Sequence, residues 1–178
     1  ITKTLHSPIA EFEKRALRNL KALPQLQAGQ LAPVLGFGSA QALPLDAASV
    51  DLIVTSPPYA ANAIDYMRAH KFSLVWLGYD TESLGQKRRE YIGRETGNIS
   101  ELESLPNYST TIVEDIAALD RQKGRALHLY YSDMIRALRE MFRVLRPGKC
   151  ALLVVGSSVM RGRDTETQNC LADIARAI

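Results

Sequence analysis

The sequence predicts an α/β fold built on a parallel sheet. Short apolar runs alternate along the chain with longer segments in which apolar residues recur at helical spacing. Two of the short runs, 50–55 and 150–155, are stopped abruptly by Ser-Pro-Pro-Tyr and Gly-Ser-Ser. Because ligands of parallel sheets bind beyond the carboxyl ends of the strands, these two strand ends are the first places to look for a functional site.

Composition supports a folded domain and excludes several classes of protein. Of the 178 residues, 46% are hydrophobic and 23% are charged, which excludes a disordered tail, a collagen-like repeat and a coiled coil. We expect a single, incomplete domain over residues 1–178, with one hydrophobic core and an insertion at 80–125. The net charge of +3 permits a polyanionic partner without requiring one.

Nothing in the sequence indicates a membrane or a secreted environment. No apolar run approaches the ~20 residues of a membrane helix, and no signal peptide is recognised at Ile1. The missing initiator methionine suggests a processed chain or a piece of a longer one. The cysteines, Cys150 and Cys170, form neither a disulfide framework nor a metal-binding spacing, so we expect a cytoplasmic protein without a metal site.

The first predicted helix covers residues 9–23. Ser7 and Pro8 supply an N-cap and a proline at the first helical position, and Pro24 ends the segment. Apolar residues recur at helical spacing, and the basic residues lie largely off that stripe, where we interpret them as a solvated face. These basic residues are Lys14, Arg15, Arg18 and Lys21.

Two strands are predicted next. The run 31–37 is the weaker candidate, because proline and glycine interrupt it. The run 50–55 is short, rich in β-branched residues and almost continuously apolar, which is typical of a strand buried on both faces of a parallel sheet.

Helical periodicity returns after the second strand. We predict a helix from Asn62, which can cap it, to Gly78, which ends it. The polar stretch 80–125 is predicted to be an insertion that is helical at 112–119 and a candidate target-recognition element.

The carboxyl-terminal third has the clearest pattern. Residues 126–145 carry apolar side chains at i, i+3, i+4 and i+7, which predicts a long helix that Arg-Pro-Gly at 146–148 stops. The strand 150–155 follows, and a last helix is predicted over 164–178.

The strand end at Ser56-Pro57-Pro58-Tyr59, the 56–59 segment, combines groups that suit a planar amine. Two prolines stiffen the backbone and remove N–H donors, which leaves carbonyl acceptors. The serine hydroxyl can donate or accept a hydrogen bond, and the tyrosine adds a flat apolar face. A planar ring with an exocyclic amine could bond to these acceptors and stack on Tyr59. The alternative is a rigid turn that only ends the strand.

The run 51–59, Asp-Leu-Ile-Val-Thr-Ser-Pro-Pro-Tyr, resembles the catalytic motif of the DNA amino-methyltransferases. That family uses S-adenosyl-L-methionine to methylate cytosine N4 or adenine N6, and the serine form is more typical of its N4-cytosine enzymes. The Leu-Arg-Pro-Gly-Lys turn at 145–149 is similar to the turn before the family's fifth strand. The resemblance covers roughly residues 31–78 and 126–158 and implies a Rossmann-like, S-adenosylmethionine-dependent methyltransferase fold.

This resemblance implies catalytic roles for Ser56, Pro57, Pro58 and Tyr59. The Ser56 side chain and the Pro57 carbonyl would accept the two hydrogens of the amine and free its lone pair for attack on the sulfonium methyl group, without a metal. The target base must leave the duplex, so the expected partner is DNA with a flipped base, on which Tyr59 would stack.

By the same resemblance, Gly38, Ser39 and Ala40 match the loop that flanks the adenine of the cofactor. Related sequences often have an aspartate where Ser39 stands. The family's glycine-rich loop for the methionine end of the cofactor is not recognised in these 178 residues, so we expect this chain alone to bind S-adenosylmethionine weakly or not at all. A plain turn with two glycines is the alternative.

Basic residues elsewhere are weaker candidates. Those of the insertion could contact phosphates, although a solvated face is the simpler interpretation: Lys87, Arg88, Arg89 and Arg94. Arg161 and Arg163 follow the strand 150–155 and could face DNA. We expect Trp76 to pack in the core or at a helix end, and Cys150 to be a buried, inert side chain.

Other functions stay open on the sequence alone. They are an adenine N6 DNA methyltransferase, a methyltransferase acting on RNA or protein amines, and a catalytically inert fragment that serves as a binding module.

Overall fold

The computed structural model describes residues 7–22, 33–60, 66–88, 91–94 and 97–178. The chain divides into two compact units, Ile1–Phe37 and Gly38–Ile178. The candidate site residues all lie in the second unit, and the single-domain organisation stays a prediction.

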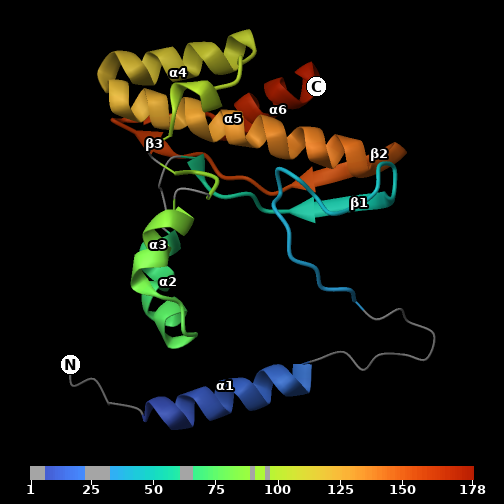
Figure 1. The fold of residues 1–178 in the computed structure, drawn as a ribbon, viewed down its shortest axis with the longest axis vertical. Coiled ribbons are helices and arrows are strands. Elements are labelled where there is room, and N and C mark those ends of the chain that lie inside the picture. Colours follow the sequence, from blue (N-terminus) through green and yellow to red (C-terminus); the bar gives the residue numbers. More distant parts are fainter. Residues whose placement is uncertain (1–6, 23–32, 61–65, 89–90, 95–96) are drawn as a thin grey trace. The chain divides into compact units, whose positions relative to one another are not determined.

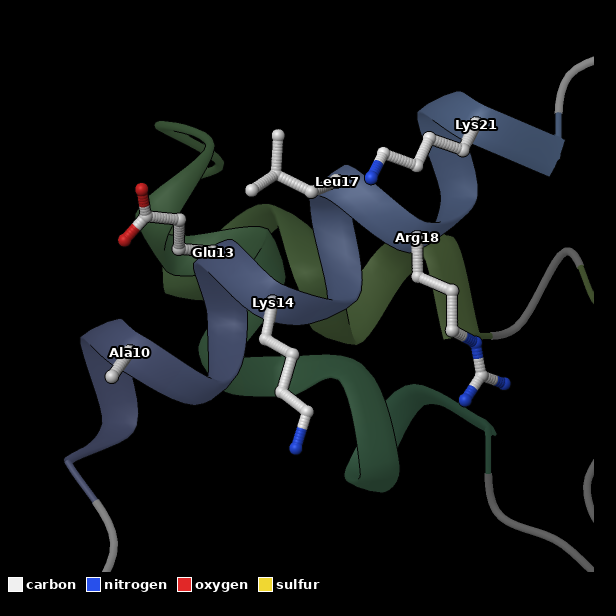
Figure 2. Close-up of a pocket in the computed structure, with 6 residues that line it drawn as sticks. All are labelled: Ala10, Glu13, Lys14, Leu17, Arg18 and Lys21. Carbon is white, nitrogen blue, oxygen red and sulfur yellow. The ribbon is translucent and has the colours of Figure 1, made fainter.

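The first unit contains one described helix, α1, over Pro8–Ala22. The predicted N-cap is confirmed, because the Ser7 hydroxyl accepts a hydrogen bond from the Ala10 N–H at 3.5 Å. No residue of α1 is buried. A shallow groove runs along this helix and is lined by residues of α1 itself, including Lys14, Arg18 and Lys21 (Figure 2).

The strand predicted at 31–37 is wrong for the residues that the structure describes. Residues 33–37 have no regular structure, and Val34, Leu35 and Phe37 are almost fully exposed. Pro33 lacks an N–H donor and Gly36 weakens an extended conformation, so this apolar run has little to hold it in a sheet.

The second unit carries a small parallel sheet, a layer of helices and a hairpin (Figure 1). In chain order its elements are β1 Val50–Thr55, α2 Tyr66–Trp76, α3 Thr81–Arg88, the 3₁₀ helix η2 Ile99–Glu101, α4 Asn107–Leu119, α5 Arg121–Val144, β2 Leu145–Leu153, β3 Val159–Met160, β4 Arg163–Asp164 and α6 Thr167–Ala177.

Strands β1 and β2 pair in parallel, as predicted, with Thr55 opposite Leu153. The register shifts between the pairs Val50–Leu145 and Leu52–Cys150, so β2 uses more residues than β1 over the same length. The Arg-Pro-Gly-Lys residues at 146–149 fill this irregularity, and Gly148 has a φ of +76°. The predicted turn is therefore an irregular start of the strand rather than a loop before it.

The prediction that β1 is buried on both faces is wrong in this chain. Ile53 packs against the core, whereas the side chains of Leu52 and Val54 are 56% and 63% exposed. The same alternation continues in β2, where Leu153 packs inward and Leu152 is exposed. Successive residues of a strand point to opposite faces, and in the described part of the chain the helical layer covers only one of them.

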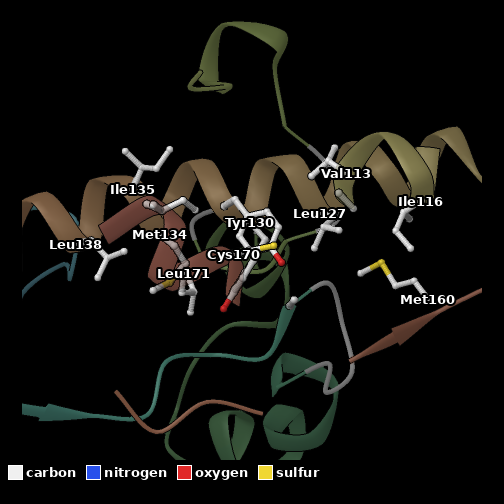
Figure 3. Close-up of a cluster of buried hydrophobic side chains, with 14 of the residues drawn as sticks. Val113, Ile116, Leu127, Tyr130, Met134, Ile135, Leu138, Met160, Cys170 and Leu171 are labelled. Atoms are coloured by element: carbon white, nitrogen blue, oxygen red, sulfur yellow. The ribbon is translucent and has the colours of Figure 1, made fainter. Parts of the chain in front are cut away.

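The core lies between that inner face and the helices α4, α5 and α6, with α5 supplying most of it (Figure 3). Tyr130 and Tyr131 are fully buried and meet edge to face, with ring centroids 5.3 Å apart. Helix α5 begins at Arg121, earlier than the predicted residue 126, because the Asp120 carboxylate accepts hydrogen bonds from the N–H groups of Gln122 and Lys123.

Two packing predictions and one helix boundary differ from the structure. Trp76 is 92% exposed at the end of α2, and Cys150 is exposed on β2. The last helix begins at Thr167 rather than at residue 164 because β3 and β4 form a hairpin first. Its turn residues, Arg161 and Gly162, both have positive φ angles, of 50° and 79°. The predicted cap at Asn62 lies outside the described residues.

Candidate functional site

The two distinctive strand ends lie at the same edge of the sheet. Thr55 and Leu153 are register partners, and the Val154 N–H donates to the Thr55 carbonyl at 2.9 Å beyond the last paired residue of β2. The 56–59 segment and the Gly-Ser-Ser run at 156–158 therefore leave the sheet together. This confirms the prediction that the 56–59 segment follows a parallel strand at its carboxyl end.

The Tyr59 ring lies against Gly156. A Cβ atom added to Gly156 would stand 2.9 Å from Cε1 of Tyr59, so no larger side chain fits at residue 156 unless the ring moves. Tyr59 remains 39% exposed in this position. The ring is therefore held by the neighbouring strand end while part of it stays open to solvent.

Helix α5 holds the backbone of the 56–59 segment. The Tyr130 hydroxyl donates a hydrogen bond of 3.0 Å to the Pro58 carbonyl, and Ala60 is fully buried in the core. Neither the Ser56 hydroxyl nor the Pro57 carbonyl has a hydrogen-bond partner among the residues that the structure describes. The Pro58 carbonyl thus joins the segment to α5, whereas the Ser56 hydroxyl and the Pro57 carbonyl can accept hydrogen bonds from a ligand.

The turn at 91–94 also reaches the 56–59 segment. Gly93 has a φ of +90°, and its added Cβ would lie 3.5 Å from the Tyr59 carbonyl oxygen. Glycine adopts this backbone conformation without a steric penalty. The site is therefore bordered by strand β2, helix α5 and the turn at 91–94.

An ionised carboxylate stands near the second strand end. The Ser157 hydroxyl donates to Asp164, which also accepts a hydrogen bond of 2.7 Å from the Glu166 N–H. These two donors, the Ser157 hydroxyl first, lower the pKa of Asp164. The sequence does not point to Asp164, because its partner Ser157 lies on the other side of the β3–β4 hairpin turn.

The candidate cofactor residues Gly38, Ser39 and Ala40 form an exposed turn. The Ser39 hydroxyl accepts a hydrogen bond from the Gln41 N–H at 3.2 Å, and the Ser39 carbonyl accepts one from the Ala42 N–H at 3.0 Å. Within the described part of the chain, no hydrogen bond joins this turn to the 56–59 segment. The structure brings together the two strand ends, and among the described residues the turn is not hydrogen-bonded to either of them.

Two of the six basic candidates, Arg94 and Arg161, are paired with carboxylates. The Arg94 side chain is only 13% exposed and pairs with Glu101 at 2.5 Å. Arg161 pairs with Asp120 at 2.8 Å, whereas Arg163 is exposed. Nothing is described of the side chains of Lys87, Arg88 and Arg89. Arg94 is thus a structural residue, and a solvated or phosphate-binding role for it is wrong.

The described residues include neither a membrane-spanning helix nor a cluster of metal ligands. No helix among them is long and apolar enough to cross a membrane. The same residues contain no group of three or more histidine, cysteine, aspartate or glutamate side chains that could hold a metal ion.

Comparison with known proteins adds no relative. The chain matches no family model, no curated protein and no solved structure. What can be said of its function therefore comes from the residues and from the geometry of the strand ends.

Proposed function

We propose that this chain contributes the base-binding and catalytic side of an enzyme that transfers a methyl group from S-adenosyl-L-methionine to an exocyclic amine of DNA, with cytosine N4 favoured. The observation that carries the proposal is the state of the 56–59 segment. At the shared edge of the strands, the Ser56 hydroxyl and the Pro57 carbonyl have no partner in the described chain, beside the half-exposed ring of Tyr59.

These groups match the needs of an aromatic amine. The lone pair of the cytosine amine is delocalised into the ring, which makes the nitrogen a poor nucleophile. Ser56 and the Pro57 carbonyl would each accept one N–H bond and so favour a tetrahedral nitrogen. Tyr59 would stack on the face of the flipped base and hold it in place.

The bound cofactor supplies an electrophilic methyl group. In this chain, the turn at Gly38, Ser39 and Ala40 is the part that fits its adenine, because all three residues are exposed and the Ser39 hydroxyl can still donate a hydrogen bond. The turn offers no carboxylate for the ribose hydroxyls. These residues therefore support a contact between the turn and the adenine, but not one with the ribose.

Nucleoside analysis tests the proposal. The full-length protein is incubated with duplex DNA and S-adenosylmethionine labelled in the methyl group, and the DNA is then digested to nucleosides. We expect the label in N4-methylcytosine and its loss in Ser56→Ala. Ser49→Ala is the matched control, since Ser49 lies before the other end of β1 and bonds to the Asp46 carbonyl.

The same measurement separates the other functions. Label in N6-methyladenine would move the target to adenine while keeping the site. Label in RNA or protein but not in DNA would change the substrate class. Absence of transfer to any of these would contradict the proposal and leave a binding module.

A further inference from the structure

Asp133 is a buried carboxylate that the proposed chemistry does not use. It lies in the middle of α5 and is fully buried. Its Oδ1 atom lies 2.5 Å from Arg136 and 3.5 Å from Arg94, and its Oδ2 atom has no hydrogen bond in the described part of the chain. Burial raises the pKa of Asp133, against the opposing effect of the two guanidinium groups.

The Arg94 side of this cluster leads to the 56–59 segment. Arg94 follows Gly93, which packs on the Tyr59 carbonyl, and the Arg94 N–H closes the turn by donating to the Tyr91 carbonyl at 3.3 Å. The Arg94 guanidinium also pairs with Glu101. Its side chain therefore fixes the turn at 91–94 to α5 beside the proposed base-binding groups.

The Arg136 side leads to the proposed adenine-binding turn. The Arg136 Nε–H donates to the Gln41 side chain at 2.7 Å, within the turn that Ser39 and Ala42 close. A second Arg136 nitrogen donates to the Glu101 carbonyl at 3.1 Å. Asp133 thus has one arginine partner directed at each half of the proposed site.

We propose that Asp133 is a positioning residue that couples the turn at 91–94, and through it Tyr59, to the turn at 39–42. The assignment of the two turns to base binding and adenine binding rests on the proposed function, whereas the inferred coupling between them does not. A buried charge is costly to keep and costly to leave unpaired, so a carboxylate at this position is better explained by the two arginines that it orients than by stability.

Hydrogen exchange of single backbone amides tests the coupling. In Asp133→Asn we expect the amides of both Arg94 and Ala42 to exchange about tenfold faster or more, because Arg136 loses a charge-assisted hydrogen bond and Arg94 loses an ion pair. The amides of the α5 core should keep their protection. The aromatic NMR signals of Tyr59 should shift, which a role confined to helix packing would not cause.

A second variant and a matched control sharpen the test. Arg94→Gln removes one partner of Asp133, so it should speed hydrogen exchange at residue 94 directly and, through Asp133 and Arg136, at Ala42 to a smaller extent. Glu140→Gln is the control, because Glu140 pairs with Arg143 on the same helix at the same i, i+3 spacing. Glu140→Gln should speed hydrogen exchange of the Leu43 amide, which donates to Glu140, and leave the exchange of the Arg94 amide unchanged.

The outcomes for the coupling and for the proposed function are distinguishable. Unchanged Arg94 and Ala42 amides in Asp133→Asn, or equal acceleration throughout α5, would overturn the coupling. If Asp133→Asn does not fold, an unchanged Ala42 amide in Arg94→Gln would overturn it as well. These readouts need no methyl transfer, so failure of the nucleoside assay leaves the coupling intact.

Discussion

At the scale of single residues, the 56–59 segment depends on a hydrogen bond that comes from a distant part of the sequence. Tyr130 is buried in α5 and donates its hydroxyl to the Pro58 carbonyl. Pro57 and Pro58 stiffen the segment locally, and this contact joins it to the helix. The neighbouring Tyr131 makes an analogous bond to the Thr165 carbonyl, away from the segment.

We expect Tyr130→Phe to lower the free energy of unfolding by about 0.5–1.5 kcal/mol, because the Pro58 carbonyl loses its donor. Denaturant unfolding measures the change. Tyr131→Phe is the control and should cost a similar amount. Only Tyr130→Phe should also speed hydrogen exchange at Ala60, and equal effects of the two variants at that amide would contradict the account.

The sequence predicts the 56–59 segment well because its signals are local. An apolar strand followed by two prolines specifies both the strand end and the rigid backbone after it. The proposed role of Asp133 was not predictable, since its partner Arg94 lies in the polar stretch 80–125, where the sequence favours a solvated surface residue. Burial of the pair is decided by the tertiary fold, which no short window of sequence contains.

At the scale of elements, helices α4 and α5 lie in close contact at Gly124. A Cβ atom added there would lie 2.4 Å from Cβ and 2.5 Å from Cα of Ala117. Since Ala117 meets this position with its backbone as well as its side chain, rotation of a side chain cannot relieve the clash. The contact sets the spacing of the two helices that carry much of the core.

We expect Gly124→Ala to destabilise the protein by about 1–3 kcal/mol, the usual cost of overpacking a close contact. Thermal or denaturant unfolding gives the value. The control is Gly85→Ala in α3, where an added Cβ has no neighbour within 4 Å. It should be neutral or stabilise the helix by up to about 1 kcal/mol. A Gly124→Ala protein as stable as wild type would show that the helices can separate freely.

Strand β1 illustrates which features of an element the sequence predicts and which it does not. Its position and its abrupt stop follow from residues 50–59, and its parallel pairing follows from the alternation of strands and helices along the chain. Its exposed outer face does not, because the segments that cover a strand come from elsewhere in the chain. The hairpin β3–β4 was also missed, since each of its strands is only two residues long and leaves no periodicity.

At the scale of the whole molecule, paired carboxylates make stability depend on pH. Hydrogen bonds from Arg143 and from the Leu43 N–H lower the pKa of Glu140 from its ordinary value of 4.5 to about 2. Four other carboxyl groups have lowered pKa values as well: Asp51, Asp120, Asp164 and Glu166. Asp133 acts in the opposite sense, because burial raises its pKa.

The sign of the pH effect follows from linkage. A lowered pKa in the folded state means that the unfolded state binds more protons, so the Glu140 contribution is complete above pH 4.5 and is lost as the pH falls toward 2. We expect the melting temperature to fall in acid over this range, and to fall less steeply in Glu140→Gln. Identical slopes in the two proteins would contradict the assignment.

The central claim is that the 56–59 segment acts on an amine as it reacts, and steady-state kinetics of Ser56→Ala tests it most directly. With a duplex substrate, the account predicts a fall in turnover of about a hundredfold or more, while the affinity for DNA changes little, because the Ser56 contact strengthens in the transition state. Tyr59→Ala should instead weaken binding of the flipped base, since stacking is worth ~1–3 kcal/mol. If Ser56→Ala keeps full turnover, the serine is a turn residue and the proposed chemistry is contradicted.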